Sequence, residues 1–280
     1  MHLAQRAGGV IVSADSRQVY RRFDIGTAKP SAEDRAAVPH RGIDVVEPTE
    51  RYSAARFAAA AAGWMTEAGD RPVLCCGGTG FYLQALVAPL APVPDLDPDA
   101  RAALQRELAG VDTAALRTRV ATLDPARAPL GRAQLLRALE VALLTGRPLS
   151  AWHADAPVRP PRPARWLLVD PGASLRDRIA HRLDGMFAAG WVDEAGALAA
   201  AVPADAPAWQ ACGYRTVRDV ALGRAELAAA RATIFIETRQ YAKRQRTWFR
   251  HQLAGARVTT LDPAAPDALA RAAAWWEGEA

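Results

Sequence analysis

Short apolar runs alternate with longer helical patterns along this chain. The runs at 10–12, 72–76 and 164–170 are brief and mainly apolar, and 257–261 is a last run of the same kind. Such runs are typical of strands that are buried in a parallel sheet. Helix-favouring stretches such as 54–68 separate them. Strands that alternate with helices predict an α/β fold, in which one parallel sheet directs its strand ends toward a single crevice.

Two serines mark expected helix starts. Ser53 directly precedes the alanine-rich stretch 54–68 and is expected to be its N-cap. Ser174 and Asp177 have the spacing of a capping box, which predicts a helix from there to Gly190. Both features indicate helices that pack beside the predicted sheet.

The middle of the chain has a different organisation. Proline-rich passages at 89–98 and 157–163 flank a stretch whose apolar positions recur at helical spacing. Proline-rich segments are extended and stiff, so they are suited to leaving and re-entering a domain. We therefore expect an all-helical insert at 95–163, carried on an α/β core formed by 1–94 and 164–280.

Polar residues and glycines follow the first two predicted strands. The sequence Asp-Ser-Arg-Gln occupies 15–18 after the first strand, and Gly77, Gly78 and Thr79 follow the second. Paired glycines let backbone N–H groups approach a ligand closely, and Thr79 is expected to cap the next helix. Either loop alone is equally compatible with an ordinary strand-to-helix connection. Their convergence at one sheet edge favours a binding site.

A stripe of basic residues lies near the C-terminus. Arg239, Lys243, Arg246 and Arg250 fall at i, i+4, i+7 and i+11 of a predicted helix at 231–252, so they share one narrow face. Like charges at this spacing destabilise a helix by some tenths of a kcal/mol. A solvated face is the alternative, but the uniform sign favours binding of a polyanion, either pyrophosphate or an RNA backbone.

Composition narrows the class of protein without deciding it. Lys and Arg exceed Asp and Glu by 35 − 30 = 5 among 280 residues, which is a mild excess. No stretch approaches 18 consecutive apolar residues, so no membrane helix is expected, and the N-terminus does not resemble a signal peptide. The three cysteines match neither a disulfide framework nor a metal motif, which fits a reducing cytoplasm.

Five motifs, taken together and in order, closely resemble the tRNA dimethylallyltransferase family, also called IPP transferases. They are Ser13 to Tyr20, Asp24 to Pro30, Gly77 to Tyr82, Arg137 to Val141 and Thr238 to Arg250. The resemblance covers nearly the whole chain and implies a core like that of P-loop NTPases. It also implies transfer of a dimethylallyl group from dimethylallyl pyrophosphate to N6 of the adenosine just 3′ of the tRNA anticodon, position 37.

The resemblance assigns roles to particular residues. It implies that Asp15 is the general base that accepts the N6 proton, and that Thr79 lies beside the reacting adenine. It implies tRNA contacts by Asp15, Ser16, Arg17, Gln18, Thr79, Arg101, Gln134 and Arg137. Gln134 stands where relatives often carry a basic residue. Arg239 and Lys243 are expected to neutralise pyrophosphate together with Mg²⁺; the residues that hold the metal are not identified.

The proposed partners are therefore the tRNA anticodon stem-loop and dimethylallyl pyrophosphate, bound by a cytoplasmic monomer. We expect Asp15 and Thr79 to face one shared tunnel, with cationic side chains on its far side. A base that reacts there must leave its stack and enter a base-sized pocket.

One family feature has no counterpart in this sequence. Family members carry a strand and a phosphate-binding loop, G-x-x-x-x-G-K-[ST], before the position of Met1, and His2 to Arg6 look like the second half of the helix that follows it. The missing strand is expected to be central, so backbone groups beside it would be unpaired. Two explanations are a start assigned too far downstream and a truncated, non-catalytic tRNA-binding remnant. A P-loop-type nucleotide or small-molecule kinase is a third alternative.

Overall fold

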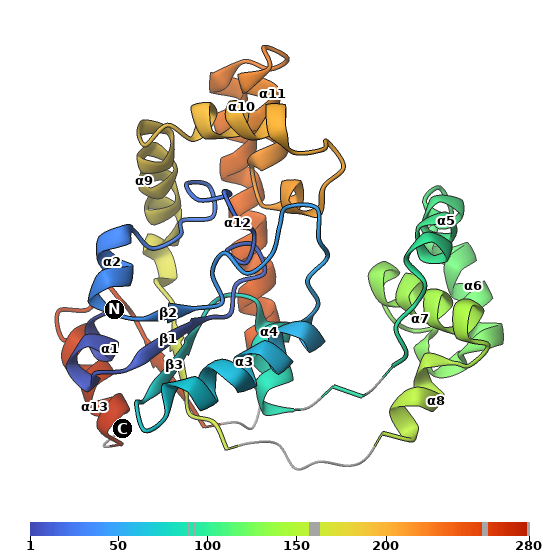
Figure 1. The fold of residues 1–280 in the computed structure, drawn as a ribbon, viewed down its shortest axis with the longest axis horizontal. Coiled ribbons are helices and arrows are strands. Elements are labelled where there is room, and N and C mark those ends of the chain that lie inside the picture. Colours follow the sequence, from blue (N-terminus) through green and yellow to red (C-terminus); the bar gives the residue numbers. More distant parts are fainter. Residues whose placement is uncertain (89, 92, 157–162, 254–256, 279–280) are drawn as a thin grey trace. The chain divides into compact units, whose positions relative to one another are not determined.

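The computed structural model describes residues 1–280 except 89, 92, 157–162, 254–256 and 279–280. The chain divides into two compact units (Figure 1): residues 1–88 with 162–280 form unit 1, and residues 89–161 form unit 2.

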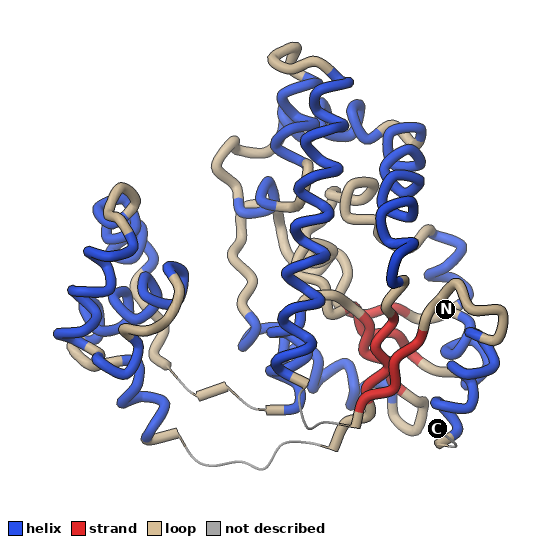
Figure 2. The backbone as a smooth tube through the Cα atoms, turned by 180° about the vertical axis from the view of Figure 1, so that it is seen from behind, coloured by secondary structure: helices blue, strands red, loops and turns tan. Residues whose placement is uncertain are grey.

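Two groups of parallel strands lie in unit 1 (Figure 2). In the first, β1 (Val10–Ser13) lies between β2 (His40–Arg41) and β3 (Val73–Cys76). In the second, β4 (Trp166–Val169) pairs with β5 (Val258–Leu261). All four strands expected from apolar runs are present. β2 was not predicted, because a two-residue strand produces no apolar run.

The expectation of a single sheet is wrong in one respect. The three apolar runs were expected to share one sheet, but β4 pairs with β5 and not with β1 or β3. Among the described residues, β3 is hydrogen-bonded to a strand on one side only, and so is β4. Of the three strands β1, β3 and β4, only β1 and β3 therefore bring their carboxyl ends together through direct strand pairing.

Nine α-helices are described in unit 1. They are α1 (His2–Ala7), α2 (Ala32–Ala37), α3 (Ala54–Ala68), α4 (Gly80–Val87), α9 (Leu175–Ala188), α10 (Trp191–Ala201), α11 (Tyr214–Ala221), α12 (Leu227–Gln252) and α13 (Ala268–Glu277). Helix α12 contacts α9 and α11 near one end and α4 near the other (Figure 1). At 1.5 Å per residue its 26 residues span about 39 Å, so one helix connects the helical end of the unit with the sheet end.

The two predicted serine caps have different outcomes. The Ser53 hydroxyl accepts a hydrogen bond from the backbone N–H of Arg56 at 3.2 Å, which confirms it as the N-cap of α3. The predicted capping box at Ser174 is wrong. Ser174 lies in a 3₁₀ turn and already has helical dihedral angles, so its hydroxyl donates back to the carbonyl of Pro171 at 2.8 Å.

Unit 2 contains only helices among its described residues, as the apolar spacing predicted. They are α5 (Pro98–Leu108), α6 (Thr113–Leu123), a 3₁₀ turn at Pro125–Arg127, α7 (Arg132–Thr145) and α8 (Leu149–Ala154). Its core consists of Leu104, Leu108, Leu116, Val120, Leu135, Ala138 and Leu139. Within the described part of the chain, no helix is both long and apolar enough to cross a bilayer.

Candidate active site

The ends of β1 and β3 are joined by direct backbone contacts. The N–H of Ala14 donates to the carbonyl of Cys76 at 2.7 Å, and the N–H of Thr79 donates to the carbonyl of Ala14 at 3.2 Å. A Cβ atom at Gly77 would lie 2.2 Å from that same carbonyl oxygen. Only glycine permits this approach, which explains the first residue of the Gly-Gly-Thr motif.

Asp15 and Thr79 meet through Ser16. Asp15 Oδ1 accepts hydrogen bonds from the backbone N–H groups of Arg17 at 2.7 Å and Gln18 at 3.4 Å. Thr79 Oγ1 accepts from the N–H of Ser16 at 3.0 Å and donates to the Ser16 hydroxyl at 3.3 Å. Thr79 is the N-cap residue of α4 as predicted, but its hydroxyl does not cap the helix because it is bonded to Ser16.

A large cavity of about 1500 Å³ adjoins this junction. Asp15, Arg17 and Gly78 contribute to its wall, whereas Ser16, Gln18 and Thr79 do not. Further cations on the wall are Arg178, Arg182, Arg215 and Arg244, and the acidic residues besides Asp15 are Asp177 and Glu237. A cavity of this volume exceeds a typical site for one small ligand. Arginines outnumber carboxylates on its wall, which suits a polar, anionic ligand.

Helix α12 supplies two residues that the sequence analysis left without a role. Gln245 Nε2 donates to the carbonyl of Gly78 at 2.9 Å. Tyr241 and Gln245 both line the large cavity. Burial raises the pKa of Tyr241, and the negative charge of Asp15 raises that pKa further. Tyr241 and Gln245 are spaced i, i+4 on the face of α12 opposite the basic stripe. This spacing was the one feature of the sequence that could have indicated that they act together.

Gln18 is occupied inside the structure. Its Nε2 donates to the carbonyl oxygens of Thr27 at 3.1 Å and Ala28 at 3.0 Å, while its Oε1 accepts from the Ser13 hydroxyl at 2.8 Å. These bonds attach the loop at 24–28 to the end of β1. The tRNA contact implied for Gln18 stays a prediction, and its amide supports the loop instead of lining the cavity.

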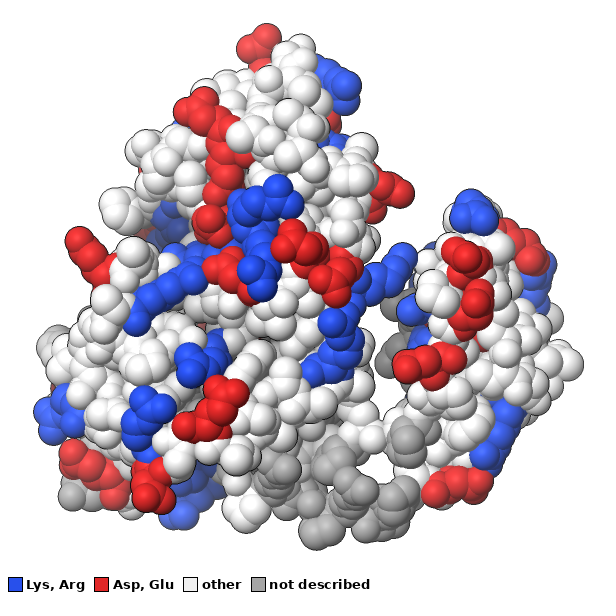
Figure 3. All heavy atoms as spheres, in the orientation of Figure 1, with Lys and Arg blue, Asp and Glu red and all other residues white. Residues whose placement is uncertain are grey.

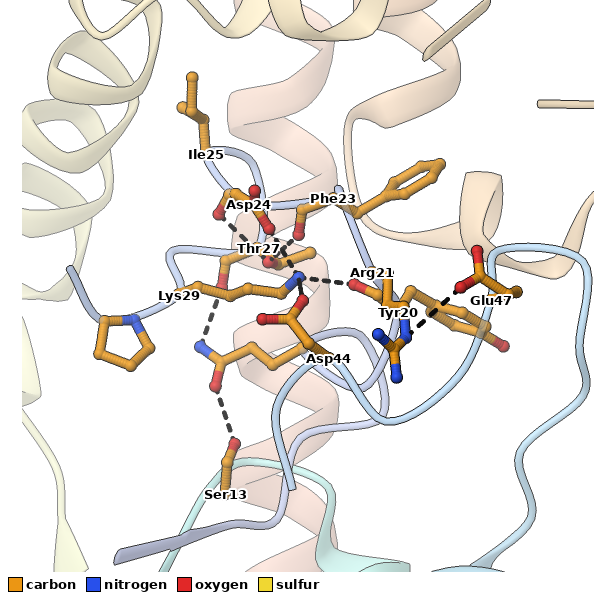
Figure 4. A network of polar contacts seen from close by, with 12 residues as sticks. Ser13, Tyr20, Arg21, Phe23, Asp24, Ile25, Thr27, Lys29, Asp44 and Glu47 are labelled. Carbon is orange, nitrogen blue, oxygen red and sulfur yellow. Dashed lines mark hydrogen bonds and ion pairs between the residues drawn. The ribbon is translucent and has the colours of Figure 1, made fainter. Parts of the chain in front are cut away.

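Lys29 is likewise enclosed. Its Nζ donates to the Tyr20 carbonyl at 2.6 Å, to Asp24 at 2.7 Å and to Asp44 at 2.6 Å, and only 2% of its side chain is exposed (Figure 4). All three ammonium protons are used, so Lys29 is not a phosphate ligand. Burial acts to raise the pKa of Asp44, but hydrogen bonds from Lys29 and Arg35 outweigh it and lower that pKa.

Three consecutive backbone N–H groups of the same loop are bound from the helical end of unit 1. Glu194 Oε2 accepts from the N–H groups of Asp24 at 3.0 Å and Ile25 at 2.8 Å. The Tyr214 hydroxyl donates to Glu194 Oε1 at 2.6 Å and accepts from the N–H of Gly26 at 3.1 Å. We call this arrangement the Glu194–Tyr214 clamp. It fixes Gly26, which is part of the wall of the large cavity.

The predicted pyrophosphate ligands line a different, smaller cavity. Arg239 and Lys243 contribute to a space of about 480 Å³. The other residues of its wall are Gly172, Ala173, Leu175, Arg176, Ile236, Gln240 and Arg246. Leu175 and Gln240 also line the large cavity, so the two cavities adjoin. The expectation of one shared tunnel is not met, because Asp15 lines one cavity, Arg239 and Lys243 line its neighbour, and Thr79 lines neither.

The basic stripe is not free of acidic partners. Arg246 Nε donates to both carboxylate oxygens of Asp170 at 3.1 Å each, and Arg246 Nη2 is also bonded to Asp170. The hydrogen bond from Arg246 lowers the pKa of Asp170. Asp170 follows β4, far away in sequence, which is why local spacing did not reveal it. On the face shown in Figure 3, basic and acidic side chains are intermixed.

The remaining predicted contacts lie in unit 2. Arg101 and Arg137 are both bonded to Glu140, at 2.9 Å and 3.4 Å. Gln134 Oε1 accepts from the N–H of Gly131 at 3.1 Å, so it supports the start of α7. Their implied contacts with tRNA stay predictions.

No group of three or more His, Cys, Asp or Glu residues within the described ranges is arranged to hold a metal ion. Mg²⁺ is commonly bound by one or two carboxylates together with substrate phosphates. One or two carboxylates are fewer than such a group, so the expected use of Mg²⁺ with the pyrophosphate stays a prediction.

A comparison with known protein families gives one decisive match. The sequence model of the family described as IPP transferase matches residues 18–252, which include Gln18 at the end of the first strand-end motif, the Gly-Gly-Thr loop and α12. The chain belongs to the IPP transferase family. This confirms the resemblance that the five sequence motifs indicated.

Individual relatives of this IPP transferase family member agree. The chain is 42% identical over 268 residues to a tRNA dimethylallyltransferase of Stenotrophomonas maltophilia strain R551-3, covering 90% of this chain and 84% of the relative. A full-length tRNA isopentenylpyrophosphate transferase from Bacillus halodurans is 33% identical, with a TM-score of 0.66 over 99% of this chain and 90% of that one.

A third likeness concerns the fold alone. The structure of a eukaryotic dimethylallyltransferase has a TM-score of 0.78 over 99% of this chain and 74% of that one, at 23% identity. The α/β fold with a parallel sheet that the alternating pattern predicted is therefore confirmed.

Proposed function

We propose that the protein transfers a dimethylallyl group from dimethylallyl pyrophosphate to N6 of the adenosine at position 37 of tRNA. The products are N6-isopentenyladenosine and pyrophosphate. The observation that carries the proposal is the carboxylate of Asp15 at the wall of a large cavity, next to the Gly-Gly-Thr loop, in a chain of the IPP transferase family.

Asp15 is the proposed general base. An aromatic amine is a poor nucleophile, so removal of its proton assists attack. Both hydrogen bonds from the backbone reach Oδ1, so these bonds leave Oδ2 to take the N6 proton. A bond forms between N6 and C1 of the dimethylallyl group, while the bond from C1 to the pyrophosphate oxygen breaks. Thr79 contributes by holding Ser16, and Gln245 holds the neighbouring Gly78.

Arg239 and Lys243 are the proposed ligands of the pyrophosphate. Negative charge grows on the leaving oxygen as its bond to C1 breaks, and fixed cations stabilise that charge. Both residues line the smaller cavity together with Arg176. Magnesium, when bound with the pyrophosphate, supplies further positive charge there.

The large cavity is the proposed site of the adenine, which leaves its stack to enter. Arg17 in the cavity wall is a proposed contact to the RNA, with Asp15, Ser16, Gln18 and Thr79 forming the loops beside it. In unit 2, Arg101, Gln134 and Arg137 are the proposed contacts to the anticodon stem-loop. We propose that the protein acts as a cytoplasmic monomer.

The test is transfer of isotope from labelled dimethylallyl pyrophosphate to tRNA. Asp15→Asn should lower turnover by about 10²-fold or more, while tRNA affinity stays nearly unchanged. Asp177→Asn is the matched control, because Asp177 also lines the large cavity and the change in charge is the same. Equal loss of turnover in both variants would contradict the role of Asp15. No incorporation by the unsubstituted protein would contradict the proposed function.

A second candidate is a tRNA-binding protein without catalysis. It is favoured by one observation, that no G-x-x-x-x-G-K-[ST] motif occurs within these 280 residues, although this loop commonly holds phosphate. Retained tRNA binding without measurable pyrophosphate binding would support it. A measurement of Mg²⁺-dependent ATP affinity separates the transferase and the tRNA-binding protein from a kinase, because only a kinase requires tight binding of ATP.

A further inference from the structure

Unit 2 contains a buried carboxylate that binds three side chains. Glu140 on α7 is only 4% exposed. Its Oε2 accepts from Arg101 Nε at 2.9 Å and from Arg137 Nη1 at 3.4 Å, while its Oε1 accepts from Gln105 Nε2 at 2.5 Å. Arg101 Nη2 also lies 2.9 Å from Oε2. One acidic group on α7 therefore connects two guanidinium groups and an amide, on both α5 and α7.

The number of cations exceeds what the carboxylate requires. A buried charge is costly unless it is paired and hydrogen-bonded, and one guanidinium with the Gln105 amide already meets that need. The second arginine leaves the group with a net charge of plus one. About a third of each arginine side chain is exposed, 32% for Arg101 and 38% for Arg137.

The exposed parts of both guanidinium groups retain donors. Each guanidinium has five N–H bonds in a fixed planar fork. Arg101 uses Nε and Nη2 toward Glu140, and Arg137 uses Nη1. Both guanidinium groups donate to the same atom, Glu140 Oε2, so their remaining N–H donors lie close to one another. Such forks match the geometry of phosphate oxygens.

We propose that Glu140 is a positioning residue for RNA binding, which holds Arg101 and Arg137 as a pair that binds the phosphate backbone of the anticodon stem-loop. This inference rests on the proposed function, because it requires that the protein binds tRNA. It differs from that function in assigning an acidic, buried residue to the binding of a polyanion.

Simple electrostatics makes the opposite prediction, which gives a sharp test. Glu140→Gln preserves the shape of the side chain and removes one negative charge near the RNA. If Glu140 only offsets positive charge, the variant binds RNA more tightly, because the net charge of the unit rises. If Glu140 positions the two arginines, the variant binds RNA more weakly despite the added net charge.

Glu107→Gln is the matched control. Glu107 also lies in unit 2, but its side chain is 67% exposed and approaches Arg119 only at 3.7 Å. It produces the same change in net charge without touching Arg101 or Arg137. We expect its RNA affinity to equal or slightly exceed that of the unsubstituted protein.

The experiment measures fluorescence anisotropy of a labelled anticodon stem-loop RNA with the full chain, across a salt series. Glu140→Gln should weaken binding about fivefold and reduce the slope of log affinity against log salt by about one phosphate contact. Equal or tighter binding by Glu140→Gln overturns the inference alone. Absence of RNA binding by the unsubstituted protein overturns the proposed function instead.

A second variant keeps the test decisive if Glu140→Gln disturbs folding, which helical circular dichroism and a thermal unfolding curve would reveal. Arg101→Lys keeps the positive charge and leaves Glu140 with a cationic partner, but it removes the planar fork. We expect about the same loss of RNA affinity as for Glu140→Gln. Unchanged affinity for Arg101→Lys would overturn the pairing of the two arginines.

Discussion

Tyr214→Phe tests the Glu194–Tyr214 clamp by removing a single oxygen atom. The Tyr214 side chain is fully buried, and its ring packs against Phe23, Trp191 and Trp209 at centroid distances of 4.8, 5.4 and 6.4 Å. Phenylalanine retains all of these ring contacts. The change therefore isolates the hydroxyl group.

The structure gives the size of the effect. The lost hydroxyl donates to the Glu194 carboxylate at 2.6 Å and accepts from the N–H of Gly26 at 3.1 Å. A hydrogen bond to a charged group contributes about 1.5–3 kcal/mol. The N–H of Gly26 is only part-buried at the cavity wall, where water can replace the lost acceptor. We therefore expect the free energy of unfolding to fall by about 1–3 kcal/mol.

The assay is urea unfolding followed by circular dichroism, with the midpoint and slope fitted separately. The control is Tyr52→Phe, because the Tyr52 hydroxyl is buried but has no hydrogen-bond partner among the described residues. It should change stability by less than about 0.5 kcal/mol or stabilise the protein slightly. A Tyr214→Phe effect as small as that of Tyr52→Phe would refute the clamp.

Three further substitutions have defined outcomes. Gly77→Ala places a Cβ 2.2 Å from the carbonyl oxygen of Ala14 and should destabilise the protein by about 3 kcal/mol or more in the same urea assay; a loss below 1 kcal/mol would contradict the close approach. Asp44 has a pKa below its usual 3.8, because bonds from its cationic partners outweigh burial, which acts to raise it. The ionised Asp44 therefore contributes its full stabilisation above about pH 4, and this contribution is lost as the pH falls further. The difference in unfolding free energy between Asp44→Asn and the unsubstituted protein should shrink below that pH. A constant difference from pH 7 to 3 would disprove the lowered pKa of Asp44. Arg246→Met removes the hydrogen bond that lowers the pKa of Asp170, so that pKa should rise toward 3.8 in an NMR titration, and no rise would refute the pairing.

The sequence predicted the elements whose causes are local. Apolar runs correctly identified the strands β1, β3, β4 and β5. The expectation that such strands are buried is confirmed for β1 only, because the residues of β3 and β4 are half-buried or exposed and only Leu261 of β5 is buried. Ser53 was correctly identified as a cap, because its hydroxyl bonds a backbone group three residues away. Asp15 and Thr79 were expected to be neighbours, because parallel strands end at the same edge of a sheet.

Features made by distant residues were not predictable from spacing. Asp170 pairs with Arg246 across 76 positions, and Glu194 binds Ile25 across 169. No periodicity in the sequence relates such pairs. Ser174 is a related case. Residues 174–177 have the residue types of a capping box, but Ser174 lies in a 3₁₀ turn, which the residue types alone did not indicate.

Helix geometry accounts for the division of the site into two cavities. At 100° per residue, Tyr241 lies about 180° around α12 from the midpoint of Arg239 and Lys243. Tyr241 accordingly lines the large cavity, and the two cations line the smaller one. Gln240 lies between these directions and lines both. If the adenine occupies one cavity and the pyrophosphate the other, the migrating carbon must pass beside α12, so this one helix fixes the distance between the proposed donor and acceptor.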